Sequence, residues 1–64
     1  MNNTKQQLEG LRDNYLQLGK DCHNWIRREA KKDEPDVDVA YEYAILKAAY
    51  NQFVKDLQNV INHE

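Results

Sequence analysis

The apolar positions of this chain are densest between Val39 and Tyr50, where only Glu42 and Lys47 are charged. A helix built from this stretch is apolar almost all the way around, and such a helix needs partners on more than one side. The rest of the chain can supply only one other long helix. This shortage predicts that a second chain covers part of the segment.

The first half of the chain has apolar residues at alternating steps of three and four, the spacing of a helix that packs along one side. This row is Leu8, Leu11, Tyr15, Leu18, Cys22 and Trp25. It predicts a first helix over about residues 4–32, with Asn3 or Thr4 as its N-cap. Gly10 and Gly19 each weaken this helix by about 1 kcal/mol relative to alanine, and we expect the helix to continue through both.

A stop signal and a start signal follow each other around Pro35. Proline disfavours helical geometry at the preceding residue and suits the first turn of a new helix. The acidic residues beside it favour a helix start, with Asp36 as the best N-cap. We therefore expect a turn at about residues 33–36 and a second helix over about residues 36–62. Its apolar row is Val39, Tyr43, Leu46, Tyr50, Phe53, Leu57 and Val60.

Folding the chain at Pro35 brings the two apolar rows level along their whole length. Trp25 then lies opposite Leu46, and Leu18 lies opposite Phe53. Agreement between two periodic patterns and a turn signal is typical of a real fold. The sequence therefore predicts an all-α protein, with residues 1–64 forming a single antiparallel two-helix hairpin. In this arrangement Trp25 and Phe53 are core residues.

Further apolar side chains fall outside these rows, and a lone hairpin would leave them in water. The candidates for a covered interface are Tyr41, Ile45, Ala48, Ala49 and Ile26. We expect a second copy to cover them, giving a homodimeric four-helix bundle, because symmetric pairs are the commonest oligomers. The alternative is that a different protein packs against this surface.

Composition narrows the choice of partner. A net charge of −2 gives no general reason to expect nucleic acid or an anionic membrane, and no apolar run approaches the roughly 20 residues of a membrane span. One cluster, Arg27, Arg28, Lys31 and Lys32, is a candidate for polar or nucleic-acid contact. The acidic turn lies within a few residues of it and weakens its field, so a solvated helix end is the favoured interpretation.

No set of residues in the sequence forms an active site or a metal centre. Cys22 and His23 are adjacent, but His63 lies of order 20 Å away on the hairpin, and zinc needs about four ligands. Capping explains the acidic residues of the turn. Glu29 falls opposite Tyr43, where it can accept a hydrogen bond from the hydroxyl group or help to fix the register. We expect no catalysis, no cofactor, no metal and no small-molecule substrate.

The function that fits these features is a protein–protein interaction module that acts as a homodimeric bundle, such as an adaptor, regulator or inhibitor. The alternatives are a nucleic-acid-associated regulator that uses the paired basic clusters, or a purely structural dimerisation element. A lone cysteine cannot form an intrachain disulfide, and no charged-then-apolar leader opens the sequence. Both features favour the cytoplasm.

Overall fold

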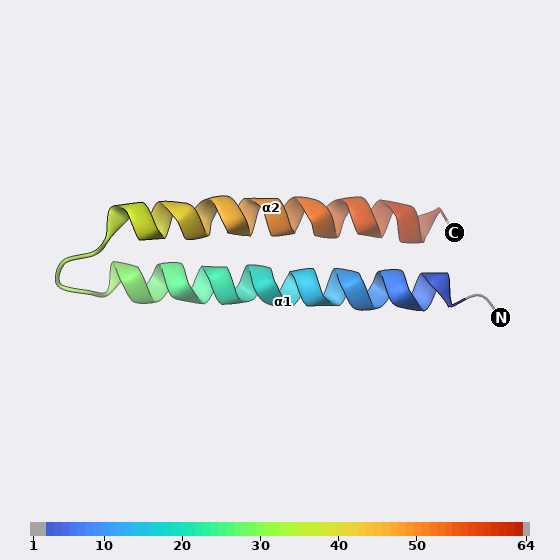
Figure 1. Cartoon of the computed structure of the whole chain (residues 1–64), viewed down its shortest axis with the longest axis horizontal. Helices are drawn as coiled ribbons and strands as arrows, with labels where there is room; N and C mark the ends of the chain where they lie inside the picture. Colours follow the sequence, from blue (N-terminus) through green and yellow to red (C-terminus); the bar gives the residue numbers. More distant parts are fainter. Residues whose placement is uncertain (1–2, 64) are drawn as a thin grey trace.

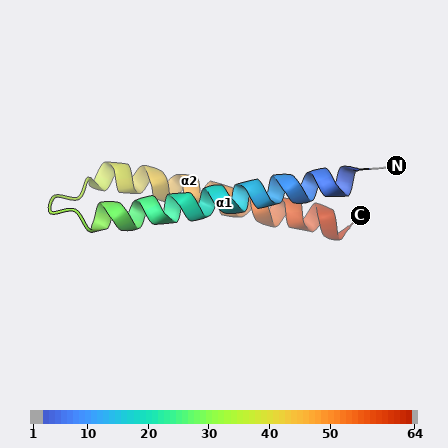
Figure 2. The ribbon, with the colours of Figure 1, turned by 90° about the horizontal axis from the view of Figure 1, so that it is seen from below.

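The computed structural model describes residues 3–63, which form two helices, α1 (Thr4–Ala30) and α2 (Val37–Asn62). The helices run antiparallel, with the turn at one end and both termini at the other (Figure 1). A view turned by 90° shows that the helices cross each other near their middles (Figure 2). There is no strand in the described part of the chain. The prediction of an all-α two-helix hairpin is confirmed.

The turn forms where the sequence places its stop and start signals. The backbone N–H groups of Lys31 and Lys32 donate to the carbonyls of Arg28 and Glu29, which closes the last turn of α1. Asp36 is the N-cap of α2, and its side chain accepts a hydrogen bond from the Val39 N–H at 3.2 Å. This cap is as predicted.

The start of α1 is less well capped than the sequence suggests. Asn3 occupies the N-cap position, but its side chain makes no capping hydrogen bond. Its backbone carbonyl accepts from the N–H of Gln7 at 2.9 Å, which begins the helix. Both Gly10 and Gly19 lie within the continuous helix, as expected.

The helices pack along rows that differ in part from the predicted ones. In α1 the row buried or half-buried against α2 is Leu8, Arg12, Tyr15, Gly19, Cys22, Ile26 and Glu29. In α2 it is Ala40, Tyr43, Lys47, Tyr50, Val54, Leu57 and Ile61. Both rows still follow steps of three and four, the spacing of coiled-coil contacts. We call these the contact rows.

The predicted packing is therefore wrong for three residues of the predicted row in each helix. Six of its members are between 41% and 49% exposed, and these are Leu11, Leu18, Trp25, Leu46, Phe53 and Val60. Trp25 and Phe53 are consequently not core residues of the single chain. Ile26, which the sequence places outside the row, is instead half-buried.

The geometry of a helix explains this shift. Residues seven positions apart in a helix form a line along one side of it. The line of Leu8, Tyr15 and Cys22 has a neighbouring line of residues on each side. The Leu11 line on one side is more apolar, whereas the other side carries Gly19. Because Gly19 has no side chain, side chains of α2 pack directly over it: a Cβ there would lie 3.2 Å from Asn51 Oδ1 and 3.9 Å from Tyr50 Cβ. The hairpin packs toward the side with the small residue.

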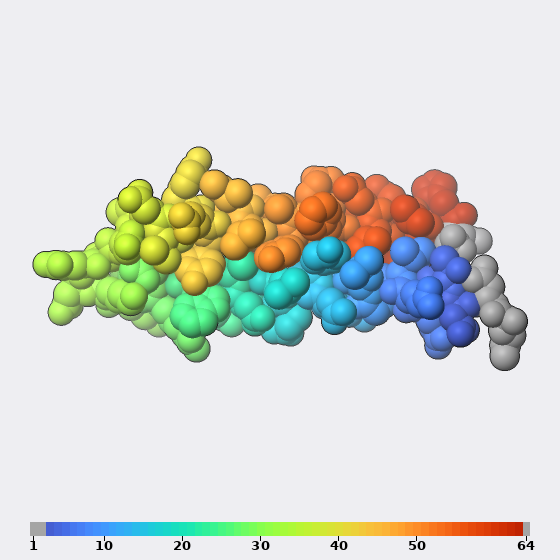
Figure 3. All heavy atoms as spheres, viewed as in Figure 1, coloured from blue at the N-terminus to red at the C-terminus, as the bar shows by residue number. Residues whose placement is uncertain are grey.

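The resulting molecule is long and thin, with principal extents of 54 × 14 × 12 Å. Figure 3 shows the atoms of the two helices side by side and in contact along their length. Among the described residues, only Cys22 and Ile61 are buried apolar side chains, each 7% exposed. A single hairpin thus leaves most of its apolar surface in contact with water.

Candidate interaction surfaces

The six exposed members of the predicted rows lie together on one side of the hairpin. We call this surface the aromatic face; it consists of Leu11, Leu18, Trp25, Leu46, Phe53 and Val60, with Tyr15, Tyr43 and Tyr50 between the two lines. The exposed residues of α1 and those of α2 each border the same side of their own contact row. When two helices pack antiparallel, these two sides lie on the same face of the hairpin.

Ring contacts across the helices confirm this arrangement. The Tyr15 ring lies between two rings of α2, with centroid distances of 5.2 Å to Phe53 and 5.8 Å to Tyr50. Nearer the turn, the Trp25 ring stacks on Tyr43 at 6.0 Å with an interplanar angle of 12°. Such pairs contribute about 0.5–1.5 kcal/mol beyond the area they bury. The rings therefore hold the face together, while Trp25 and Phe53 remain 49% and 47% exposed.

The opposite side of the hairpin is polar. Lys47 lies in the contact row of α2, and its ammonium group reaches out to donate to His23 Nδ1 at 3.0 Å. A shallow groove of about 340 Å³ runs past these two residues and is lined also by Leu16, Gly19 and Asn51. Long basic side chains in a contact row commonly bury their stems and keep their charges in water.

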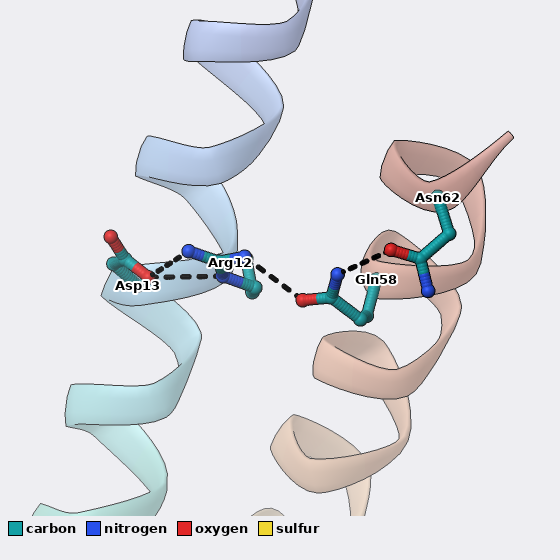
Figure 4. Close-up of polar contacts among 4 residues, drawn as sticks. All are labelled: Arg12, Asp13, Gln58 and Asn62. Carbon is teal, nitrogen blue, oxygen red and sulfur yellow. Dashed lines mark hydrogen bonds and ion pairs between the residues drawn. The ribbon is translucent and has the colours of Figure 1, made fainter. Parts of the chain in front are cut away.

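A second polar bridge crosses this side near the chain ends (Figure 4). Arg12 Nη1 donates to Gln58 Oε1 at 2.9 Å, and the Arg12 guanidinium also pairs with Asp13 at 2.9 Å. Gln58 in turn donates to Asn62 Oδ1 at 2.8 Å. The hydrogen bond from Arg12 to Gln58 ties α1 to α2 on the polar side, so each side of the hairpin has its own kind of interhelix contact.

The interface candidates from the sequence occupy several positions. Tyr41 and Ile45 lie on the outer surface of α2, with 67% and 53% of their area exposed. Ala48 is also exposed, whereas Ala49 is half-buried beside the aromatic face. Ile26 faces α2 in the contact row. Tyr41, Ile45 and Ala48 therefore form what we call the outer stripe.

The basic cluster is partly engaged within its own chain. Lys32 Nζ makes an ion pair with Glu29 at 2.8 Å, and the Arg28 guanidinium lies 5.2 Å from the centre of the Trp25 ring. Arg27 and Lys31 are exposed at the end of α1. Two of the four cations thus already have partners, which reduces the charge that the cluster can offer to a polyanion.

Glu29 is held at the turn rather than against the Tyr43 hydroxyl. It is 7% exposed, and its Oε1 accepts a hydrogen bond from the backbone N–H of Asp36 at 2.8 Å. The hydrogen bond from Lys32 and then the one from Asp36 lower the pKa of Glu29 below its ordinary value of 4.5. The same ion pair raises the pKa of Lys32. The carboxylate therefore joins the end of α1 to the start of α2.

No group of three or more histidine, cysteine and acidic side chains in residues 3–63 is placed to hold a metal ion. Neither α1 nor α2 combines the length and the apolar character that crossing a membrane requires.

Comparison with known proteins identified no relative of this chain. No protein-family model matches the chain, and searches of curated proteins and of solved structures gave no match either. The arrangement of its surfaces is therefore the basis for any functional conclusion.

Proposed function

We propose that this chain is a small, non-enzymatic protein–protein interaction module that acts as a homodimeric helical bundle and binds another protein as an adaptor, regulator or inhibitor. One observation carries the proposal: many large apolar side chains are exposed and very few apolar residues are fully buried. Ten large apolar side chains are 40% to 74% exposed, compared with two buried apolar residues in the described part of the chain.

Size strengthens this argument. A chain of 64 residues buries only about 60% of its unfolded surface even when it folds into a compact shape, and a rod of two helices buries less. Contiguous apolar surface on so small a protein marks an interaction site. Association would supply the burial that the hairpin lacks, so folding and assembly would be linked.

The first experiment measures the mass of the chain in solution. Gel filtration coupled to light scattering, over a range of micromolar concentrations, should give the mass of two chains with strong helical circular dichroism. A chain that stays monomeric and fully folded over that range would contradict the homodimer. The lone cysteine gives the cytoplasm as the expected location, which fractionation of cells that express the tagged chain would test.

The same preparation distinguishes the nucleic-acid alternative. We expect no binding to duplex DNA or RNA at physiological salt. Binding that falls steeply between low and physiological salt would instead support a role for the basic cluster, because phosphate contacts release counterions. Charge reversal of two exposed members, Arg27→Glu with Lys31→Glu, should abolish such binding if the cluster is responsible.

A further inference from the structure

We propose that two copies of this chain meet through the aromatic face, and not through Tyr41, Ile45 and Ala48 as the sequence suggests. The outer stripe formed by these three residues is then left for the partner protein. This inference rests on the proposed homodimer and deepens it, because it assigns each apolar surface to one occupant. Three features of the aromatic face favour a second copy as its occupant: its area, its symmetry and its border of polar residues.

One whole side of the hairpin has the area that a stable dimer buries. The hairpin measures 54 Å by 14 Å across its two longest extents, so one whole side, with the aromatic face at its middle, projects an area of about 750 Å². Stable interfaces bury roughly 800 Å² on each partner. The outer stripe lies on α2 alone, so it offers a narrower surface that suits a single helix or loop of another protein.

The spacing of the face makes it complementary to itself. Its residues repeat every seven positions in both helices, and Leu18 lies level with Phe53 at the centre. A two-fold axis through this centre sets the large Trp25 ring against a smaller leucine of the other copy. That leucine is Leu11 if the two turns lie at opposite ends of the dimer, and Leu46 if they lie at the same end. With the turns at the same end, Leu18 meets Phe53 of the other copy; with the turns at opposite ends, Leu18 and Phe53 each meet the same residue of the other copy. Large residues therefore meet smaller ones throughout only when the two turns lie at the same end, and dense packing favours that arrangement.

The polar residues that border the face are also compatible with a second copy. The helix positions beside the exposed lines are Gln7, Asn14, Asp21, Arg28, Glu42, Ala49, Asp56 and His63. The same two-fold axes set Arg28 against Gln7 or Glu42, and Asp21 against Asn14 or Ala49. Like charges do not meet in either arrangement. An apolar centre with a polar border is the usual anatomy of a protein interface.

The polar side of the hairpin is a poor alternative. Lys47 and Arg12 extend their charges there to His23 and Gln58, and the groove beside Lys47 and His23 is lined mostly by polar residues. Covering these charges with a second copy would remove water from them without supplying counter-charges. The aromatic face carries no such cost.

The fluorescence of Trp25 can report whether the aromatic face becomes covered. Trp25 is the only tryptophan in the sequence, and it is 49% exposed in the single hairpin. We expect its emission maximum to move to shorter wavelength, and quenching by acrylamide to fall at least about twofold, as rising protein concentration populates the dimer. A doubled mass with unchanged Trp25 quenching would overturn the aromatic face as the interface and would leave the homodimer intact.

A matched pair of variants provides the second test. Leu16 and Leu18 are the same residue type, are 40% and 41% exposed, and lie on opposite sides of α1. Leu18→Glu should raise the dimer dissociation constant at least about 100-fold because it places a charge at the centre of the interface. Leu16→Glu and Ile45→Glu should change it by less than about threefold. Equal effects of Leu16→Glu and Leu18→Glu, or loss of the dimer in Ile45→Glu, would refute the assignment.

A milder variant covers the case in which Leu18→Glu does not fold. Leu18→Ala keeps a strong helix former and should weaken the dimer about tenfold, with helicity restored at high protein concentration. A dimer that is no weaker in Leu18→Ala than in Leu16→Ala would count against the aromatic face. A wild-type chain that is monomeric at every concentration would remove the homodimer itself, and with it this inference.

Discussion

The Glu29 carboxylate accepts a hydrogen bond from the backbone N–H of Asp36 at 2.8 Å, across the turn that joins the two helices. Asp36 is itself the N-cap of α2, and Lys32 completes the arrangement through its ion pair with Glu29. A buried acid in a contact row is unfavourable unless its oxygens are satisfied. Here both oxygens have partners, so the acid helps to fix the turn.

The lowered pKa of Glu29 predicts a pH dependence of stability. The folded state binds this proton less readily than the unfolded state, so the stabilisation is complete above the ordinary value of 4.5. It is lost as the pH falls through the lower pKa of the folded state. Glu29→Gln should therefore be less stable than the wild type at neutral pH, and the difference in unfolding free energy should shrink as the pH falls below the ordinary pKa of Glu29. Urea denaturation of both proteins from neutral pH down to pH values below that pKa, at one protein concentration, measures the effect. A difference that does not change with pH would contradict the ion pair.

The Asp36 cap predicts a stability loss at the start of α2. Asp36→Ala removes the acceptor for the Val39 N–H and should cost about 1 kcal/mol. Asp36→Asn keeps an oxygen in the same place and should cost much less. Thermal unfolding followed by circular dichroism compares the two. If alanine and asparagine at this position are equivalent, the side-chain cap contributes nothing.

The two glycines predict opposite responses to larger side chains. A Cβ on Gly10 meets nothing within 4 Å, so Gly10→Ala should stabilise the protein by about 1 kcal/mol through helix propensity. Gly19→Ala should gain less, because the Asn51 side chain must shift to relieve the 3.2 Å contact. Gly19→Leu should destabilise the hairpin by forcing the helices apart, whereas Gly10→Leu should not. Equal unfolding midpoints for the two leucine variants would show that the helices do not approach closely at Gly19.

The bridge between Arg12 and Gln58 predicts a measurable coupling between the helices. A double-mutant cycle with Arg12→Ala and Gln58→Ala should give a coupling free energy of about 0.5–1.5 kcal/mol. Gln17 and Asp21 provide the control, because their 2.9 Å hydrogen bond lies within α1. That cycle should give only about 0.2–0.5 kcal/mol. A coupling for Arg12 and Gln58 no larger than the control value would show that the bridge does not hold the helices together.

The sequence by itself determined the two helices, the turn between them and the cap at Asp36. These features depend on neighbouring residues: apolar spacing fixes a helix, and Pro35 with its acidic neighbours ends one helix and starts the next. The sequence also placed the residues of the aromatic face in the apolar row of each helix, but it predicted that these residues form the core between the helices. It could not show which side of each row would turn toward the other helix.

Only the tertiary structure decided that orientation. One line of α1, made up of Leu8, Tyr15 and Cys22, faces α2 in either orientation of the helix. The second line that faces α2 can be the one that contains Leu11 or the one that contains Gly19, and apolar content favours the Leu11 line. Packing of α2 side chains directly over Gly19, with Lys47 and Arg12 reaching out to polar partners, selects the Gly19 line. Helix rotation depends on how side chains from both helices fit together in space, and no periodicity within one helix contains that information. A rotation of this kind converts the predicted core residues Trp25 and Phe53 into an exposed face.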